Sequence, residues 1–556
     1  MNFVVLRIQQ NKERKKQTMD TSKKIALFSV LKKDNPDINP IAEKLIGLGW
    51  EIFGSAGTVK YLKAGNQEAK DICEFTGQGP ILRHQVVTLH PSIHGGLLAR
   101  SSDDYTELDQ LGYRRIDLVY VGLYDLEGAI AALDATDESV NEATDMGGVA
   151  LLTSACKGGK IPICDPADWP EVLQQLEENG DVNAQTRQKL IAKAYLACAM
   201  YRMLSAEYFS RGEFKAMFGR LVSTTLYGEN AWQAPARLFQ RLGVPTDLLG
   251  LPAFNLAQGI APSYNNFADL DRLLQTLTHV VAGWQKNYGQ IPYAGIGVKH
   301  GNACGAAVNE TDKMAVIKGI VMGDPKAIFG GLLMLNFAVG EAEAEMILTH
   351  GMPDGKRRIL DGIIAPSFTV EAIKLLERKK DKCRLLSNPD LANLSLDRMT
   401  RFRYVRNGWL EQPNYTFVPD FNDPAMQVFG FRDVEVEMNL LLAWAIGSTS
   451  NSNTITIVKD LELEGNGVSR QNRVGAACLA IDIAKDSVHS LDGSCVYSDS
   501  FFPFLDGPAV LIGAGVKAIF STSGSVNDAK VQTLCQAAGV TLYQLPDKDA
   551  RGFFGH

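Results

Sequence analysis

The sequence lacks any long apolar run and any paired cysteine motif. Glycine or a charged residue interrupts its apolar stretches within about ten positions, whereas a membrane-spanning helix needs ~20 apolar residues. The nine cysteines of this 556-residue chain are scattered without a Cys-x-x-Cys pair. Such usage is typical of the reducing cytoplasm and offers no zinc framework. We therefore expect a cytoplasmic protein without a membrane partner.

Basic blocks and a dinucleotide fingerprint are also missing. Lys and Arg number 56 against 63 Asp and Glu, a formal net charge of -7, which argues against a nucleic-acid surface. No Gly-x-Gly-x-x-Gly follows the first predicted strand, which disfavours a dinucleotide-dependent dehydrogenase. His90 and His94 could share a metal, but Pro91 lies between them and no acidic third ligand is near. We expect no metal site.

The N-terminal segment is rich in Lys, Arg and Gln and lacks the apolar stretch of a secretory signal. We expect residues 1–23 to form a disordered extension. Met19 is an alternative start of the chain.

Strands and helices alternate in the pattern of the first half. Short apolar runs predict strands at 25–30, 50–53, 117–122 and 161–164, and a helical pattern covers 40–48. Because this is the order of a βαβ unit, we expect a parallel, doubly wound sheet with 161–164 at an edge.

A long helix is predicted over 180–211, where apolar or small residues recur at spacings of three and four. One face of this helix must be buried, which suits an element that closes a first domain, with the boundary within 212–220. The second half mixes strands with helices, and the predicted elements are strands 454–458 and 517–521 and helices 269–282 and 473–485.

The run VKHGNACG (298–305) places Lys299 and His300 side by side at the end of a predicted strand, 293–298. The strand holds the two side chains, and the glycines let a ligand approach the backbone. Histidine can take a proton from a weakly nucleophilic amine near neutral pH, and a neighbouring ammonium stabilises developing negative charge. Taken alone, such a pair is also ordinary surface chemistry.

The turn GSAGT (54–58) lies between a predicted strand and a predicted helix. Its backbone N–H groups and the hydroxyls of Ser55 and Thr58 could bind a phosphate at the helix N-terminus. A plain turn with an N-cap threonine is the alternative.

Seven further motifs accompany these two: TLHPSIHGGLLAR (88–100), TDMGGVALL (144–152), LYGENAWQAPA (226–236), SYNNFADLD (263–271), GDPKAIFGG (323–331), DGIIAPSF (361–368) and SDSFFPFLDG (498–507). In their order and spacing, residues 24–556 resemble the bifunctional AICAR transformylase/IMP cyclohydrolase family of purine biosynthesis. The joint occurrence of the motifs is highly specific.

The resemblance implies an α/β fold with a Rossmann-like, methylglyoxal-synthase-like doubly wound domain over 24–215. It implies a transformylase region over 216–556, built from two cytidine-deaminase-like α/β lobes. Active sites of family members form between subunits, so a homodimer is implied as well.

The implied function is a pair of reactions on small molecules. A formyl group passes from 10-formyltetrahydrofolate, a reduced folate co-substrate, to AICAR, giving FAICAR, which then loses water and closes to IMP. Two alternatives stay open: a monofunctional transformylase with an impaired cyclohydrolase domain, and a non-catalytic purine-nucleotide-binding paralogue.

Family residues carry over to positions in both halves. For ring closure, the resemblance implies catalytic roles for Tyr124, Asp145 and Lys157, and nucleotide binding by Ser29, Lys33, Ser55, Gly57, Thr58, Gly147 and Gly148. For formyl transfer, it implies catalytic roles for Lys299, His300 and Asn453, and substrate binding by Tyr227, Asp324, Phe329, Gly330, Asp499, Phe501 and Arg551.

Several positions depart from the family pattern. Val87 stands where family members carry a lysine in the cyclohydrolase site, and either Lys32 or Lys33 could replace that lysine. Leu226 replaces an arginine, and Arg551 falls in a blurred C-terminal motif. Losing one cation from the first site would cost about 2 to 4 kcal/mol of transition-state stabilisation.

Overall fold

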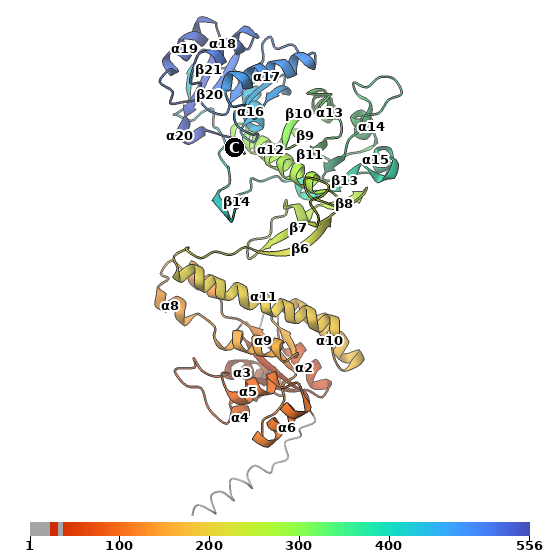
Figure 1. The fold of residues 1–556 in the computed structure, drawn as a ribbon, viewed down its shortest axis with the longest axis vertical. Coiled ribbons are helices and arrows are strands. Elements are labelled where there is room, and N and C mark those ends of the chain that lie inside the picture. The colour runs from red at the N-terminus through yellow and green to blue at the C-terminus, as the bar shows by residue number, and fades with distance from the viewer. Residues whose placement is uncertain (1–22, 32–36, 556) are drawn as a thin grey trace, which may run out of the picture. The chain divides into compact units, whose positions relative to one another are not determined.

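The computed structural model describes residues 23–31 and 37–555. The expected N-terminal extension, apart from Lys23, and both Lys32 and Lys33 lie outside the described residues. The chain divides into two compact units, one ending at Phe218 and the other starting at Gly219 (Figure 1).

The first unit is built on a five-stranded parallel sheet. Its strand order is β3-β2-β1-β4-β5, with bounds β1 Ile25–Val30, β2 Glu51–Gly54, β3 Lys70–Asp71, β4 Leu118–Gly122 and β5 Ile161–Ile163. The predicted strands at 25–30, 50–53, 117–122 and 161–164 are therefore confirmed, the last one at an edge. The predicted parallel sheet and the α/β class are confirmed too.

Helices cover both faces of this sheet. Successive side chains of a strand point to opposite faces, so each strand packs against helices on both sides. Along β1, Ala26, Phe28 and Val30 belong to one apolar cluster, and Ile25 and Leu27 belong to the other. The helices are α2 Asn39–Gly47, α3 Ala56–Ala64, α4 Ile72–Thr76, α5 Pro91–Leu98, α6 Ser102–Leu111, α7 Leu126–Ala131, α8 Asp137–Glu142, α9 Gly147–Lys157, α10 Trp169–Asn179 and α11 Ala184–Phe209. The predicted long helix is α11, which packs along α9.

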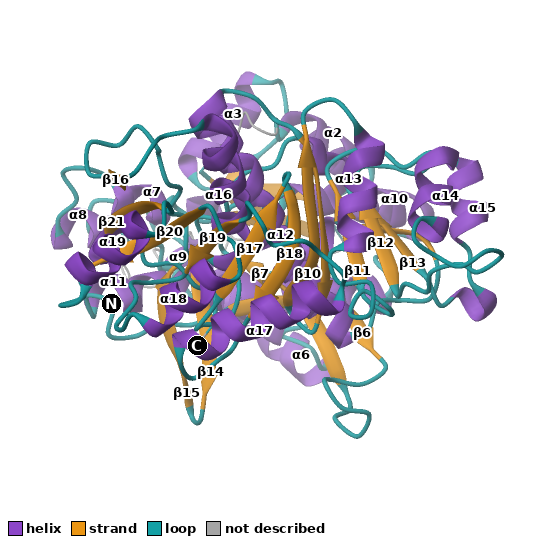
Figure 2. Cartoon of the chain, turned by 90° about the horizontal axis from the view of Figure 1, so that it is seen from above, coloured by secondary structure: helices purple, strands orange, loops and turns teal. Residues whose placement is uncertain are grey.

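The second unit contains one sheet of twelve strands, in the order β16-β21-β20-β19-β17-β18-β10-β9-β11-β12-β13-β8 (Figure 2). The strands are β8 Asn255–Gln258, β9 Tyr293–Lys299, β10 Asn302–Asn309, β11 Leu332–Leu335, β12 Gly362–Ala365, β13 Arg384–Ser387, β16 Gln427–Phe429, β17 Ile455–Lys459, β18 Glu462–Gly467, β19 Cys495–Ser498, β20 Ala518–Ser523 and β21 Thr541–Pro546. Two separate ribbons are β6 Phe218–Thr225 with β7 Ala236–Leu242, and β14 Thr400–Val405 with β15 Gly408–Pro413.

The order of elements in this unit occurs twice. A helix, a strand hairpin and three helix–strand steps run from α12 to β13, and the same series runs from α16 to β21. The helices are α12 Tyr264–Tyr288, α13 Lys313–Met322, α14 Glu341–Thr349, α15 Val370–Leu376, α16 Val434–Gly447, α17 Arg473–Asp486, α18 Asp506–Gly513, α19 Asp528–Ala537 and α20 Asp547–Ala550. Antiparallel pairing of β10 with β18 joins the two halves. The likeness of these lobes to cytidine deaminase stays a prediction.

The helices α12 and α16 lie next to each other under the centre of the sheet. Trp284 and Trp444, one from each helix, are fully buried in the same cluster. This explains why residues 440–447 of α16 are apolar on every side, since that part of the helix lies between the sheet and other elements. Among the described residues, no helix is long and apolar enough to cross a membrane.

A buried histidine on α12 makes the stability of this unit depend on pH. Nδ1 of His279 lies 2.7 Å from the carbonyl oxygen of Gln275, which makes Nδ1 the donor, and the ring stacks on Tyr415. Burial lowers the pKa of His279 to about 4. In the unfolded chain the pKa is ~6.5, so between these values only the unfolded state is protonated. The contribution to stability is complete above pH ~6.5 and is lost as pH falls toward ~4.

We predict that His279→Gln removes this acid sensitivity. The free energy of unfolding of the wild type, measured by urea titration, should fall relative to that of the variant by ~3 kcal/mol between neutral pH and pH ~4. A difference between the two proteins that does not change with pH would contradict the prediction.

Candidate functional site

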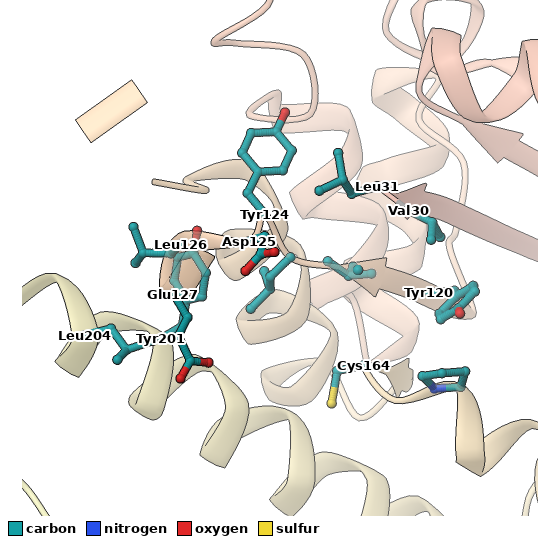
Figure 3. Close-up of a pocket in the computed structure, with 14 residues that line it drawn as sticks. Val30, Leu31, Tyr120, Tyr124, Asp125, Leu126, Glu127, Cys164, Tyr201 and Leu204 are labelled. Carbon is teal, nitrogen blue, oxygen red and sulfur yellow. The ribbon is translucent and has the colours of Figure 1, made fainter. Parts of the chain in front are cut away.

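The first site lies where the winding of the parallel sheet reverses. From β1 the chain proceeds to β2 and β3 on one side and returns to β4 and β5 on the other. Ligands of open α/β sheets bind outside the carboxyl ends of the strands at such a switch point. A cavity of about 400 Å³ lies there, lined by Val30 and Leu31 at the end of β1 and by residues 122–127 at the end of β4 (Figure 3).

The GSAGT turn follows β2 at this edge of the sheet. Ser55 is the N-cap of α3, and its hydroxyl lies 3.1 Å from that of Thr58. Thr58 is fully buried and its hydroxyl donates to the carbonyl oxygen of Val30. Gly57 lies in the first turn of α3, where backbone N–H groups lack helical partners and can bind an anion. Ser29 is half-buried in β1.

The structure brings Tyr124, Asp145 and the two glycines at the start of α9 together. The Asp145 carboxylate accepts a hydrogen bond from the Gly148 N–H at 2.7 Å. Burial raises the pKa of Asp145, and hydrogen bonds from the backbone of Gly148, Tyr124 and Gly147 oppose that effect. A methyl group on Gly148 would meet the Asp145 carboxylate at 2.5 Å, so only glycine fits there. In Figure 3, Tyr124 and Asp125 are drawn at the end of β4.

Lys157 lies apart from Tyr124, Asp145 and the two glycines. It is the last residue of the 11-residue helix α9, so it lies about 15 Å along the helix axis from Gly147. Its side chain is exposed, and its carbonyl oxygen accepts a hydrogen bond from Arg100. Its catalytic role stays a prediction.

Val87 packs against apolar residues of the first unit. It is half-buried beside the cluster formed by α5, α9 and the sheet. The next residue, Thr88, is buried, and its hydroxyl lies close to Gly147. Val87, which stands where family members carry a lysine, is therefore next to a residue that contacts the start of α9.

The second site is built around the turn between β9 and β10. Lys299 ends β9, and its ammonium group donates to the carbonyl oxygen of Phe329 at 2.6 Å. His300 follows with φ 53°, which the turn requires, and its side chain is exposed. The Gly301 N–H donates to the Asp269 carboxylate at 2.7 Å. Helix α12 therefore holds the backbone next to His300.

His300 lines two cavities. The larger, about 500 Å³, is shared with Arg272, Arg401, Asn451 and Phe554 among others. The smaller, about 220 Å³, includes Lys299, Asp324 and residues 463–466 of β18. An exposed imidazole between two cavities can contact two different small molecules at once.

Four other predicted residues lie at or near the two cavities. Asp324 lines the smaller cavity, and Phe329, with Gly330 after it, lies beside Lys299. Tyr227 is half-buried two residues from Glu229, which lines the larger cavity.

Asn453 precedes β17 and bonds to the segment that follows β18. Its side-chain amide donates to the carbonyl oxygen of Arg470 at 2.8 Å. Asn451, two residues earlier, lines the cavity with His300 instead. Sequence reasoning assigned no role to Asn451 or Asp269, although Asp269 lies in the SYNNFADLD motif.

Asp499, Phe501 and Arg551 belong to a separate cluster. The buried Asp499 carboxylate pairs with Arg473 at 2.6 Å and accepts a hydrogen bond from Ser452. Arg551 pairs with Asp547, and its guanidinium lies over the Phe501 ring. None of the three predicted residues is among those that line the two cavities at His300.

Known proteins match most of this chain. The AICARFT/IMPCHase bienzyme family matches residues 160–483. A bifunctional purine biosynthesis protein PurH from Streptococcus gordonii is 34% identical over 530 residues, covering 93% of this chain and 98% of its own length. The protein of the same name from Streptococcus pneumoniae serotype 2 is 34% identical over 521 residues, covering 92% and 96%. A solved structure titled Crystal structure of ForH is 32% identical, with TM-score 0.30, and covers 34% of this chain and 99% of its own.

The contact between Tyr124 and Asp145 predicts a measurable titration. Burial first, and the Asp145 charge second, raise the pKa of the Tyr124 hydroxyl. Asp145→Asn removes only the second cause, so the pKa of Tyr124 should fall but stay above its ordinary value. NMR titration of isotope-labelled tyrosine rings measures this pKa, with Tyr124→Phe identifying the signal. An unchanged pKa in Asp145→Asn would contradict the observed proximity.

Proposed function

The chain belongs to the AICARFT/IMPCHase bienzyme family, and on that premise we propose that it catalyses the last two steps of IMP formation. A formyl group is transferred to AICAR, and the FAICAR so formed closes to IMP with loss of water. We propose 10-formyltetrahydrofolate as the formyl donor, no metal, and a cytoplasmic homodimer as the working form. The relatives named bifunctional PurH align over nearly the whole chain and support both activities.

The observation that carries the transfer half is the position of His300 between two cavities. Transfer needs a nucleotide and a folate in contact, and the two cavities supply adjacent places for them. The amine of AICAR is weakly basic, so removal of its proton is the difficult step. We assign that proton to His300. The Lys299 ammonium, 2.6 Å from the Phe329 carbonyl oxygen, is held close enough to favour negative charge on the reacting atoms.

Ring closure needs different chemistry, which the first site can supply. A carboxamide nitrogen attacks a formamide carbonyl, so the site must move a proton and stabilise an oxyanion. We assign the proton movement to Tyr124 and Asp145. The Gly147 and Gly148 N–H groups at the start of α9 donate to the Asp145 carboxylate and so hold it in position for that step. The GSAGT turn at the neighbouring strand end suits the nucleotide phosphate.

We do not adopt the alternative of a transformylase without cyclohydrolase activity. Val87 is its one support, and the group of Tyr124, Asp145, Gly147 and Gly148 is assembled despite that residue. A non-catalytic paralogue would have no use for the Lys299-His300 pair at two cavities.

Paired variants test the two assignments against each other. We expect His300→Ala to slow formyl transfer by about 10²- to 10⁴-fold, the usual contribution of general acid-base catalysis. Cyclisation of supplied FAICAR should be unchanged in that variant. Tyr124→Phe should show the opposite, with transfer retained and FAICAR accumulating.

Each variant must keep one full activity, and binding of AICAR to His300→Ala and of FAICAR to Tyr124→Phe shows that the altered unit is folded. Spectrophotometric assays with AICAR plus formyl donor, and separately with FAICAR, measure the two rates. A His300→Ala protein that keeps more than about a tenth of wild-type transfer would exclude His300 from proton transfer. Loss of both activities in either variant would contradict two separate sites.

A further inference from the structure

Two guanidinium groups lie over one aromatic ring in the larger cavity beside His300. The guanidinium carbon of Arg272, from α12, lies 4.6 Å from the centre of the Phe554 ring. That of Arg401, from β14, lies 3.4 Å from the same centre. Phe554 itself is buried. Phe554, near the C-terminus, therefore contacts both Arg272 from α12 and Arg401 from β14.

The guanidinium of Arg272 is engaged by three acceptors from three parts of the chain. Nε donates to the Gly301 carbonyl oxygen at 2.8 Å, Nη2 to the Asn451 side chain at 2.7 Å, and Nη1 to the Phe554 carbonyl oxygen at 3.2 Å. These bonds tie the turn that follows His300 to the second lobe and to the C-terminal segment. Arg272 is a positioning residue for the cavity wall.

Arg401 differs, because its N–H groups have no hydrogen-bond acceptor among the described residues. Stacking on Phe554 holds the guanidinium plane and leaves its edge free, which is the part that forms paired hydrogen bonds to phosphate or carboxylate. A half-buried guanidinium with unused donors beside a catalytic histidine is suited to a bound anion.

Charges of both signs surround the pair, and burial lowers the pKa of Arg401 while the Asp271 carboxylate opposes that effect. Burial, and next the Arg401 charge, lower the pKa of Arg272 to about 10, so the two cations repel each other. Glu229, Asp269 and Asp271 line the same cavity, although the Asp269 carboxylate already accepts the Gly301 N–H. These three carboxylates offset the attraction that the two guanidinium groups exert on a distant anion. An anion must be held there by direct contact with the guanidinium edge.

The arginines expected from the sequence do not supply this contact. Arg551 pairs with Asp547 and lies over Phe501, and Leu226 is an exposed apolar residue. The cavity at His300 therefore takes its cations from α12 and β14.

We propose that Arg401 anchors the phosphate monoester of the nucleotide substrate in this cavity, with Arg272 as the fixed second charge. The inference rests on the proposed formyl transfer and names the side chain that orients the nucleotide for it. Contact of the phosphate with the Arg401 edge leaves the base end of the nucleotide free to reach His300.

The test compares Arg401→Gln and Arg401→Lys with a matched control, Arg406→Gln. Arg406 lies on the same ribbon, at its turn, is exposed, and does not line the cavity. Calorimetry measures binding of AICAR and of its nucleoside, which lacks the phosphate. We expect Arg401→Gln to weaken AICAR binding by about 10- to 100-fold, the value of charge-assisted hydrogen bonds, with nucleoside binding unchanged. Arg401→Lys should recover only part, because one ammonium cannot make the paired bonds.

In formyl-transfer assays the KM for AICAR should rise in Arg401→Gln while kcat changes little, and Arg406→Gln should behave as wild type. The unchanged kcat for formyl transfer, in the same unit as Arg401, confirms folding. Unchanged AICAR affinity in Arg401→Gln would overturn the proposal, and so would equal weakening of nucleotide and nucleoside binding.

Inorganic phosphate, followed by phosphorus NMR, separates this inference from the proposed function. A wild type that lacks formyl transfer yet binds phosphate through Arg401 would refute the function and keep the anion site. A wild type that transfers formyl with no dependence on Arg401 would refute the anion site alone.

Discussion

The pairing of β10 with β18 is the interaction on which the second site depends. It joins two lobes of repeated topology into one sheet, and the buried Asn466 side chain adds a hydrogen bond to the Ala303 carbonyl oxygen at 3.1 Å. Because the two hairpins lie side by side, the turn at His300 in the first lobe meets Asn451 in the second. Neither lobe alone could form the cavities at His300. The three hydrogen bonds of Arg272 also stabilise this junction.

The first unit brings distant residues together through parallel strands. Their carboxyl ends meet at one edge of the sheet, so residues distant in sequence converge there without a second lobe. Tyr124 follows β4, the GSAGT turn follows β2, and Asp145 precedes α9. Each unit thus assembles its own group of side chains. We propose that the tyrosine and carboxylate of the first move protons during ring closure, and that the histidine and lysine of the second deprotonate an amine. This division would give one chain two consecutive reactions.

Much of this could be predicted from the sequence, and the reasons for the rest are specific. The strands β1 and β4 are short buried apolar runs with clear ends, and the glycines after Lys299 mark a turn, so the fold class and the place of His300 were accessible. The helical spacing of Lys157 already implies that it lies at the far end of α9 from Asp145. Arg272 and Arg401 had no such signal, because an arginine on a helix or on an edge ribbon looks like ordinary surface charge until both are seen to contact Phe554. The twelve-stranded sheet was likewise hidden, since the pairing of β10 with β18 leaves no local pattern.

The central claim is that both reactions occur on this chain, in separate sites, despite Val87 in the first. A time course that follows FAICAR and IMP together after mixing the wild-type protein with AICAR and 10-formyltetrahydrofolate tests it most directly. The account predicts that FAICAR rises and then declines as IMP becomes the final product. FAICAR that accumulates while IMP forms no faster than without enzyme would contradict the account, and so would a complete absence of FAICAR and IMP.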